Sequence, residues 1–175
     1  MIIKGNHIRE NIHFGVLGLF LFLTACGGFR YSFVGVDIPA AAKTITIKQF
    51  PNNASSVNLK LSNELTTQLR DKFQSSTKLD LVDSRGDLLI EGEITGYALD
   101  NVALGADMAT MNRLTITVRI KYENRFDESK NLERTFSRYL DFDRNQILSQ
   151  VEDRLVTQIC EALVDDIFMA TVGNW

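Results

Sequence analysis

The sequence predicts an α+β domain in which two helices pack on one face of a four-stranded mixed sheet. Residues 114–123 alternate strictly between apolar and polar side chains, which is typical of a strand with one buried and one solvent-facing side. Residues 59–76 and 147–173 instead repeat apolar side chains every three or four positions, which predicts two amphipathic helices. Two such helices are enough to cover one face of a single sheet.

The first thirty residues are expected to target the chain rather than to fold with the domain. A weakly basic start with Lys4 and Arg9 precedes an apolar run of ten residues, 14–23, and two small residues before Cys26. This is the three-part organisation of a secretory signal peptide. The run is too short for a helix that crosses the bilayer, which needs about 20 residues.

The tetrapeptide Leu23-Thr24-Ala25-Cys26 resembles the bacterial lipobox. That resemblance implies cleavage before Cys26, a diacylglycerol on its sulfur, and further acylation such as palmitate on the new amine. Stable anchoring takes two or more acyl chains, which such a cysteine supplies. We therefore predict a lipoprotein signal peptide at 1–25, a lipidated tether and extended lead-in at 26–42, and a folded domain at 43–175. The alternative is an ordinary signal peptide with an incidental cysteine.

The composition of the mature chain argues against catalysis. Removal of 1–25 takes away both histidines of the sequence, so no Ser-His-Asp or Cys-His nucleophile is available and no zinc site that needs imidazole. Glu91 and Glu93 lie two apart on one predicted strand, whereas glycosidase carboxylates normally come from separate segments. Cys160 lies within an apolar helical pattern and is expected to be a small buried side chain. We predict no catalytic residue, no cofactor and no metal.

The charge of the mature chain argues against nucleic-acid binding. Removal of 1–25 also takes away Lys4, Arg9 and Glu10, so the formal net charge changes from −3 to −4. A nucleic-acid-binding domain is normally basic.

Between the tether and the second helix, the elements follow from local patterns. Residues 43–50 alternate as a strand, and "FRYSF" at 29–33 is read as a short extended lead-in. The first helix, 59–76, has Asn58 as its expected N-cap. A short strand at 79–84 enters a turn at Arg85-Gly86. The strand at 87–99 follows, with one face formed by Leu88, Ile90, Ile94 and Ala98 and the other by Glu91, Glu93, Thr95 and Tyr97.

The second half of the domain is predicted in the same way. A loop at 100–112 precedes the strand at 114–123, and a hairpin loop at 126–131 leads into a strand at 132–142. Asp143 and Gln146 have the spacing of a capping box before the last helix. The predicted order is β-α-β-β-β-α, in which the short segment at 79–84 is not counted as a strand of the sheet.

Several strings in this order resemble the LptE family of lipopolysaccharide-assembly lipoproteins, in the branch typical of Bacteroidota. They are "ITIKQFPNNAS", "LTTQLRDKF", "DLLIEGEITGY", "MNRLTITVRIKYEN", "SRYLDFD" and the terminal "NW". The resemblance implies an outer-membrane lipoprotein on the periplasmic side that partners and plugs the β-barrel LptD and helps to deliver lipopolysaccharide. The alternative is a generic periplasm-facing lipoprotein that binds a ligand or scaffolds an envelope complex.

Candidate contacts follow from charge and position. Lipid A presents phosphates, which arginine pairs in bidentate fashion and lysine attracts as a point charge. The candidate lipopolysaccharide contacts are Arg113, Arg119, Lys121, Arg134 and Arg138. The alternative is a solvated sheet face with cross-strand charge pairs, for example to Glu91 and Glu93. The candidate barrel contacts lie in the two loops that cap the longest strands, namely Asp100, Asn112, Asp127 and Lys130.

Overall fold

The computed structural model describes residues 36–55, 58–103 and 110–173. The predicted signal peptide, Cys26, the lead-in at 29–33 and the last two residues lie outside these ranges. The elements are β1 (Thr44–Ile47), α2 (Leu61–Ser76), β2 (Asp80–Leu81), β3 (Leu88–Ala103), β4 (Thr110–Asn124), the 3-10 turn η1 (Glu128–Lys130), β5 (Leu132–Asp143) and α3 (Leu148–Val172). None of the helices in the described ranges is both long and apolar enough to span a bilayer.

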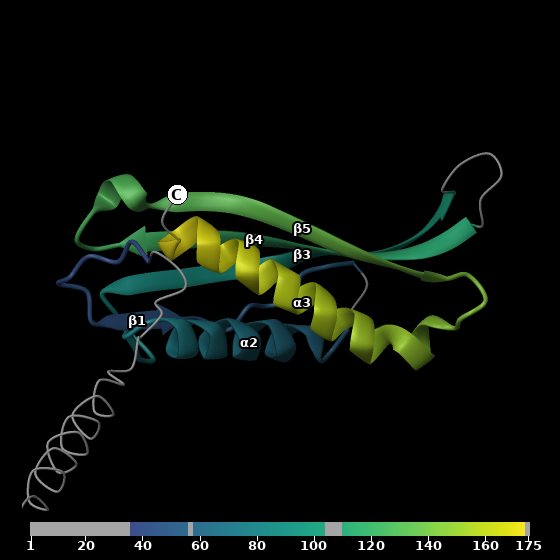
Figure 1. Cartoon of the computed structure of the whole chain (residues 1–175), viewed down its shortest axis with the longest axis horizontal. Coiled ribbons are helices and arrows are strands. Elements are labelled where there is room, and N and C mark those ends of the chain that lie inside the picture. The colour runs from purple at the N-terminus through teal and green to yellow at the C-terminus, as the bar shows by residue number, and fades with distance from the viewer. Residues whose placement is uncertain (1–35, 56–57, 104–109, 174–175) are drawn as a thin grey trace, which may run out of the picture. The chain divides into compact units, whose positions relative to one another are not determined.

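The sheet is mixed, as predicted, but it has five strands rather than four. Its order is β2-β1-β3-β4-β5, with β1 parallel to both of its neighbours and β3, β4 and β5 antiparallel (Figure 1). The additional strand is β2, which pairs with β1 through Thr44–Asp80 and Ile45–Leu81 only. A ladder of two residues is too short to show a periodicity, so the sequence pattern alone could not establish that the segment joins the sheet.

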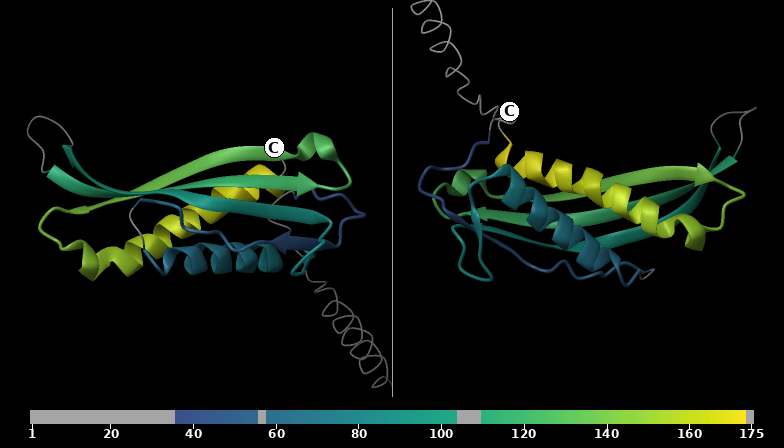
Figure 2. Two further views of the ribbon diagram at one scale, coloured as in Figure 1. Left: turned by 180° about the vertical axis from the view of Figure 1, so that it is seen from behind. Right: turned by 60° about the horizontal axis from the view of Figure 1, so that its bottom comes forward.

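Both helices pack on the same face of the sheet, as the sequence predicts (Figure 2). The apolar stripe of α2 is fully buried and consists of Leu61, Leu65, Leu69 and Phe73. The stripe of α3 is buried through Leu155, Ile159, Leu163 and Ile167. Phe73 and Phe168 join the two helices edge to face, with ring centroids 5.0 Å apart. Cys160 is buried, as expected, and burial raises the pKa of its thiol to about 12.

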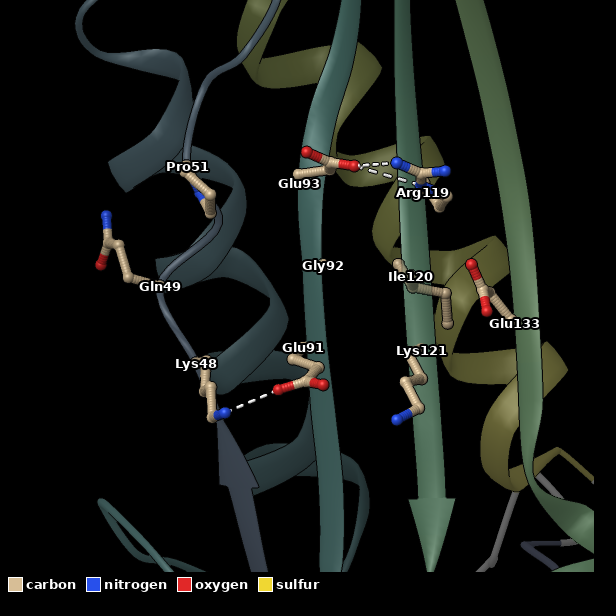
Figure 3. A pocket seen from close by; sticks show the side chains of 10 residues that line it. All are labelled: Lys48, Gln49, Pro51, Glu91, Gly92, Glu93, Arg119, Ile120, Lys121 and Glu133. Carbon is tan, nitrogen blue, oxygen red and sulfur yellow. Dashed lines mark hydrogen bonds and ion pairs between the residues drawn. The ribbon is translucent and has the colours of Figure 1, made fainter.

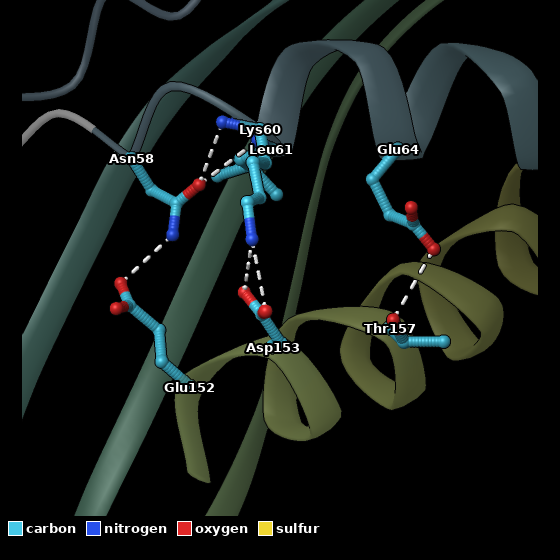
Figure 4. A network of polar contacts seen from close by, with 7 residues as sticks. All are labelled: Asn58, Lys60, Leu61, Glu64, Glu152, Asp153 and Thr157. Carbon is cyan, nitrogen blue, oxygen red and sulfur yellow. Dashed lines mark hydrogen bonds and ion pairs between the residues drawn. The ribbon is translucent and has the colours of Figure 1, made fainter. Parts of the chain in front are cut away.

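The two helix starts differ from the predicted ones. Helix α2 begins at Leu61, two residues late, and its N-cap position falls on Lys60, which makes no side-chain cap bond. Asn58 still bonds the start of the helix, because its Oδ1 accepts hydrogen bonds from the backbone N–H groups of Lys60 and Leu61 (Figure 4). The capping box expected at Asp143 and Gln146 is wrong. Asp143 Oδ1 accepts from Asn145 N at 2.7 Å in a turn before α3, and the N-cap position falls on Ile147 without a side-chain bond.

A β-bulge changes the expected faces of β3. The register runs Ile94–Val118 and then Gly96–Thr117, so Thr95 is an additional residue without a partner. Beyond Thr95, each described side chain of β3 lies on the face of the sheet opposite to the one that strict alternation predicts. Tyr97 is therefore buried on the helix side and Ala98 is exposed, the reverse of the predicted alternation.

The predicted loop at 100–112 is too long. β3 continues to Ala103 and β4 starts at Thr110, so only 104–109 separate the strands, and these lie outside the described residues. Asp100 and Asn112 consequently belong to the ladder, opposite Arg113 and Asn101. The hairpin at 126–131 is confirmed and contains η1.

Candidate functional site

The face of the sheet opposite the helices, called the open face below, carries most of the candidate residues. Its side chains come from alternate positions of β3, β4 and β5 and from Lys48 after β1. A shallow hollow of about 520 Å³ lies on this face between the exit of β1 and β5 (Figure 3). No helix or strand in the described ranges covers the hollow.

A row of charges of alternating sign crosses the hollow. Register places Glu91, Lys121 and Glu133 side by side on three neighbouring strands. Lys48 Nζ lies 2.6 Å from Glu91 Oε2, and Lys121 Nζ lies 2.6 Å from Glu123 Oε1. The ion pair with Glu123 raises the pKa of Lys121, with smaller contributions from Glu91 and Glu133. The positive and negative charges of this row, formed by Lys48, Glu91, Lys121 and Glu133, therefore balance one another.

The next row is built around Arg119. Its guanidinium donates two hydrogen bonds to Glu93 Oε1, one of them from Nε at 3.1 Å. Asn53 Nδ2 donates to the other oxygen, Glu93 Oε2, at 2.7 Å. The bonds from Arg119, and then from Asn53, lower the pKa of the Glu93 carboxyl. Arg119 is therefore held by a carboxylate rather than left available.

Arg113 forms the third charged group of the open face. It makes a bidentate pair with Asp141 at 2.7 and 2.9 Å, and its guanidinium carbon lies 3.7 Å from the ring centre of Tyr139. This pairing lowers the pKa of Asp141 and raises that of Arg113. Asp100 lies opposite Arg113 on the other side, so two carboxylates flank one cation.

The remaining two candidate arginines lie on the helix side of the sheet. Register places Arg134 opposite Ile120 and Arg138 opposite Ile116. Both isoleucines point into the core, so the two arginines lie on the same side of the sheet as the helices. Arg138 is paired with Asp166 of α3 through bonds of 2.6 and 2.5 Å. Of the five predicted phosphate contacts, the structure thus places Arg113, Arg119 and Lys121 on the open face. It places the other two on the opposite face of the sheet.

The predicted barrel contacts fall at opposite ends of the long strands. Asp100 and Asn112 lie toward the β3–β4 connection, and Asp127 and Lys130 lie in the β4–β5 hairpin. The hairpin pair already has internal partners. Asp127 Oδ1 accepts from Ser129 N at 3.1 Å, and Lys130 Nζ lies 2.5 Å from Asp37.

Sequence reasoning missed the residues of the site that come from outside the strands. Lys48 and Asn53 belong to the segment after β1, which runs alongside β3 through the bond from Lys48 N to Ile90 O and a bridge between Asn52 and Ile94. Asp166 comes from α3. No local pattern could identify these partners, since each lies more than 25 positions from the residue it binds.

Comparison with protein-family models gives one match, the lipopolysaccharide-assembly family LptE, over residues 42–171. This range contains every described strand and nearly all of both helices. The chain belongs to the LptE family. LptE is a family of non-enzymatic lipopolysaccharide-assembly lipoproteins. Membership assigns this chain to the envelope lipoproteins and to a role in lipopolysaccharide assembly. A search of curated proteins gave no match.

Solved structures share the fold at low sequence identity. A minor lipoprotein of Acinetobacter baumannii is 17% identical, with a TM-score of 0.50 over 73% of this LptE-family chain and 90% of its own. A hypothetical protein of Chlamydia trachomatis is 9% identical, with a TM-score of 0.52 over 75% and 98%. The rare lipoprotein B of Shewanella oneidensis is 16% identical, with a TM-score of 0.46 over 73% and 92%. The first two show the same arrangement of sheet and helices.

Proposed function

We propose that this chain is an outer-membrane lipoprotein, anchored through Cys26 on the periplasmic side, that partners and plugs an LptD-type barrel in lipopolysaccharide assembly. The observation that carries the proposal is the match of residues 42–171 to the LptE family. The lipobox-like tetrapeptide ending at Cys26 supports the anchor, and the short stretch between Cys26 and Val36 would keep the domain close to the membrane.

The shape of the three long strands supports a plug. β3 and β4 have 16 and 15 residues, long enough to offer an extended surface to the inner wall of a barrel. A plug held in this way buries more than the roughly 1,600 Å² of a standard interface. Loss of the protein should therefore leave the barrel misassembled, rather than only slow the delivery of lipopolysaccharide through it.

The test is depletion of this protein in cells, followed by measurement of the heat-modifiable folded form of the barrel and of surface lipopolysaccharide. We expect both to fall. A pull-down from solubilised outer membrane, with mass spectrometry, should recover a large barrel in the same strain. Normal levels of folded barrel and surface lipopolysaccharide without the protein would contradict the plug role.

The anchor has its own test. Formation of the thioether requires the sulfur, so Cys26→Ser should leave unprocessed precursor without lipid label. Cys160→Ser provides the matched control, because that thiol is buried in α3. A Cys26→Ser variant that is processed and labelled like the parent protein would refute the lipobox interpretation.

One observation favours the second candidate function, a generic periplasm-facing lipoprotein that binds a ligand or scaffolds an envelope complex. The cations of the open face are engaged by carboxylates, as expected for a solvated surface with cross-strand charge pairs. Under this alternative, no barrel co-purifies and lipopolysaccharide binds no better than a neutral detergent.

A further inference from the structure

The free edge of β5 has the properties of a strand-pairing site. β5 pairs with β4 from Leu132–Tyr122 to Asp143–Met111 without a register shift, and no described strand lies on its other side (Figures 1 and 2). About half of the N–H and C=O groups of such a strand point outward. The strand contains no proline or glycine. At the opposite edge of the sheet, by contrast, β2 has only two residues.

A groove accompanies this edge on the helix side. It has a volume of about 410 Å³ and lies between β5 and the C-terminal part of α3, with Phe136, Met169 and Ala170 among its lining residues. Apolar side chains from an added strand would continue the row formed by Phe136 and by its neighbour Val118. The edge thus offers both backbone hydrogen bonds and an apolar surface.

The two arginines on this side of β5 differ in how they are paired. Arg138 donates both of its bonds to Asp166. Arg134 lies over the ring of Phe136, 5.3 Å from the centroid, and forms no ion pair within the described part of the chain. One positive charge therefore remains uncompensated beside the free edge. A strand added here with a carboxylate opposite Arg134 is therefore favoured over one with a cation at that position.

The charges on β5 disfavour a second copy of the chain as the added strand. In an antiparallel pair of two β5 strands centred on Phe136, each Arg134 lies opposite an Arg138. Centred on Ser137, each Glu133 lies opposite an Asp141, and centred on Arg138 the two Arg138 side chains meet. Centred on Tyr139, each Arg134 lies opposite Arg144 just beyond β5, and the register centred on Thr135 opposes no like charges but pairs only residues 132–138. Like charges directly opposite each other destabilise strand pairs. Charged side chains pointing inward on an edge strand are also a recognised way to prevent self-association.

We propose that the free edge of β5 binds an extended segment of a different polypeptide, which adds to the sheet as a sixth strand and places an acidic side chain opposite Arg134 and apolar side chains over Phe136. This proposal goes beyond the assembly role above and does not depend on it. The recognition mode is strand addition, in which backbone bonds supply affinity and alternate side chains supply specificity.

The test uses the full-length protein in detergent and an acetylated ten-residue peptide of alternating valine and threonine, with one aspartate on the valine side. Hydrogen exchange should show slower exchange of β5 amides when the peptide is bound. Arg134→Glu should weaken binding by about tenfold, since an attractive pair becomes repulsive. A peptide with lysine in place of aspartate should show the reverse preference and bind Arg134→Glu more tightly than the parent protein.

Arg144→Glu is the matched control, because it makes the same charge change at an exposed turn position just beyond β5. It should leave binding of the aspartate peptide unchanged. Thermal midpoints confirm that each variant is folded. The proposal is overturned if β5 amides gain no protection, or if the two peptides show no reversed preference. It is also overturned if β5 protection rises with protein concentration alone, which would identify a second copy, or appears only with anionic lipid vesicles.

Discussion

Asn58 connects three elements of the domain, and its removal should weaken all three connections together. Its Oδ1 caps α2 through the backbone N–H groups of Lys60 and Leu61 at 2.9 and 3.0 Å. Its Nδ2 donates to Glu152 Oε1 of α3 at 2.8 Å (Figure 4). The same oxygen accepts from the hydroxyl of Tyr97 at 2.5 Å, and the bulge of β3 turns Tyr97 inward. Burial, and then the hydrogen bond to Glu152, raise the pKa of Tyr97.

Asn58→Ala should lower the free energy of unfolding by about 2 kcal/mol. Loss of an asparagine cap costs about 1 kcal/mol. Loss of a hydrogen bond to a partly exposed carboxylate adds about 1 kcal/mol, at the low end for charged acceptors because water replaces the donor in part. For a domain of this size the thermal midpoint should fall by roughly 6–10 °C. Urea unfolding followed by circular dichroism measures the first quantity and a thermal scan the second.

Asn58→Asp separates the two contributions. The carboxylate keeps the cap and suits the positive end of a helix, but it cannot donate to Glu152 and repels it. At neutral pH this variant should be less stable than the parent protein, and adding Glu152→Gln should restore stability, because the glutamine amide can donate to the new carboxylate. The reasoning is refuted if Asn58→Ala unfolds within 2 °C of the parent, or if Asn58→Asp alone is as stable as the parent protein.

Three further predictions concern the sheet. Gly92→Val should destabilise the domain by about 3 kcal/mol or more in urea titrations, because a Cβ at this position would lie 2.7 Å from the Phe50 ring and against the carbonyl of Arg119; a Thr95→Val variant with normal folding is the control, and an unchanged urea midpoint for Gly92→Val would contradict the packing. The pKa of Asp87 is lowered by hydrogen bonds from Lys43 N and from the side chain and backbone of Thr44, so its contribution to stability is present above its ordinary pKa and is lost as the pH falls through the lowered one; Asp87→Asn should reduce stability at pH 7 and flatten the loss between about pH 4 and pH 2, whereas an identical acid profile would refute this role. Arg119→Glu with Lys121→Glu should weaken lipopolysaccharide binding if the open face contacts lipid A, while the thermal midpoint changes little because both side chains are exposed; the charge-swapped variant Glu93→Arg with Arg119→Glu controls for loss of the pair, and unchanged lipopolysaccharide binding would favour the solvated face.

The long elements could be predicted because their periodicity reflects burial directly. Leu114, Ile116, Val118 and Ile120 of β4 are all fully buried, and the leucine stripe of α2 is buried at every predicted position. Tyr97 was misplaced because a single additional residue, Thr95, reverses all later side chains of β3. The isolated glycine at 96 is a local signal of such a bulge, but Gly92 in the same strand carries the same signal without one. A short strand at 79–84 is predicted, but a ladder of two residues is too short to show from sequence that it joins the sheet.

The candidate site was less predictable because a cation that pairs with a carboxylate has the same sequence signature as one that awaits a phosphate. Arg138 and Arg134 lie four positions apart on β5 and both point to the helix side. Only the fold reveals that Asp166 of α3 reaches one of them. Charge on a strand can therefore be read from sequence, while its availability depends on residues that are distant in the chain.

An anionic ligand binds best where a cationic side chain is not already paired with a carboxylate. On the open face acidic side chains outnumber basic ones, and Arg113, Arg119 and Lys121 are each engaged at 3.1 Å or less. A phosphate there must displace a carboxylate that is already bonded, so the net gain is small. Of the five candidate cations, Arg134 alone has no ion pair in the described part of the chain. Parallel measurements on Arg134→Glu and on the Arg119→Glu, Lys121→Glu pair therefore locate the contact. Lipopolysaccharide binding that survives the double reversal but not Arg134→Glu would move the anionic site from the open face to the edge of β5, where it would compete with strand addition.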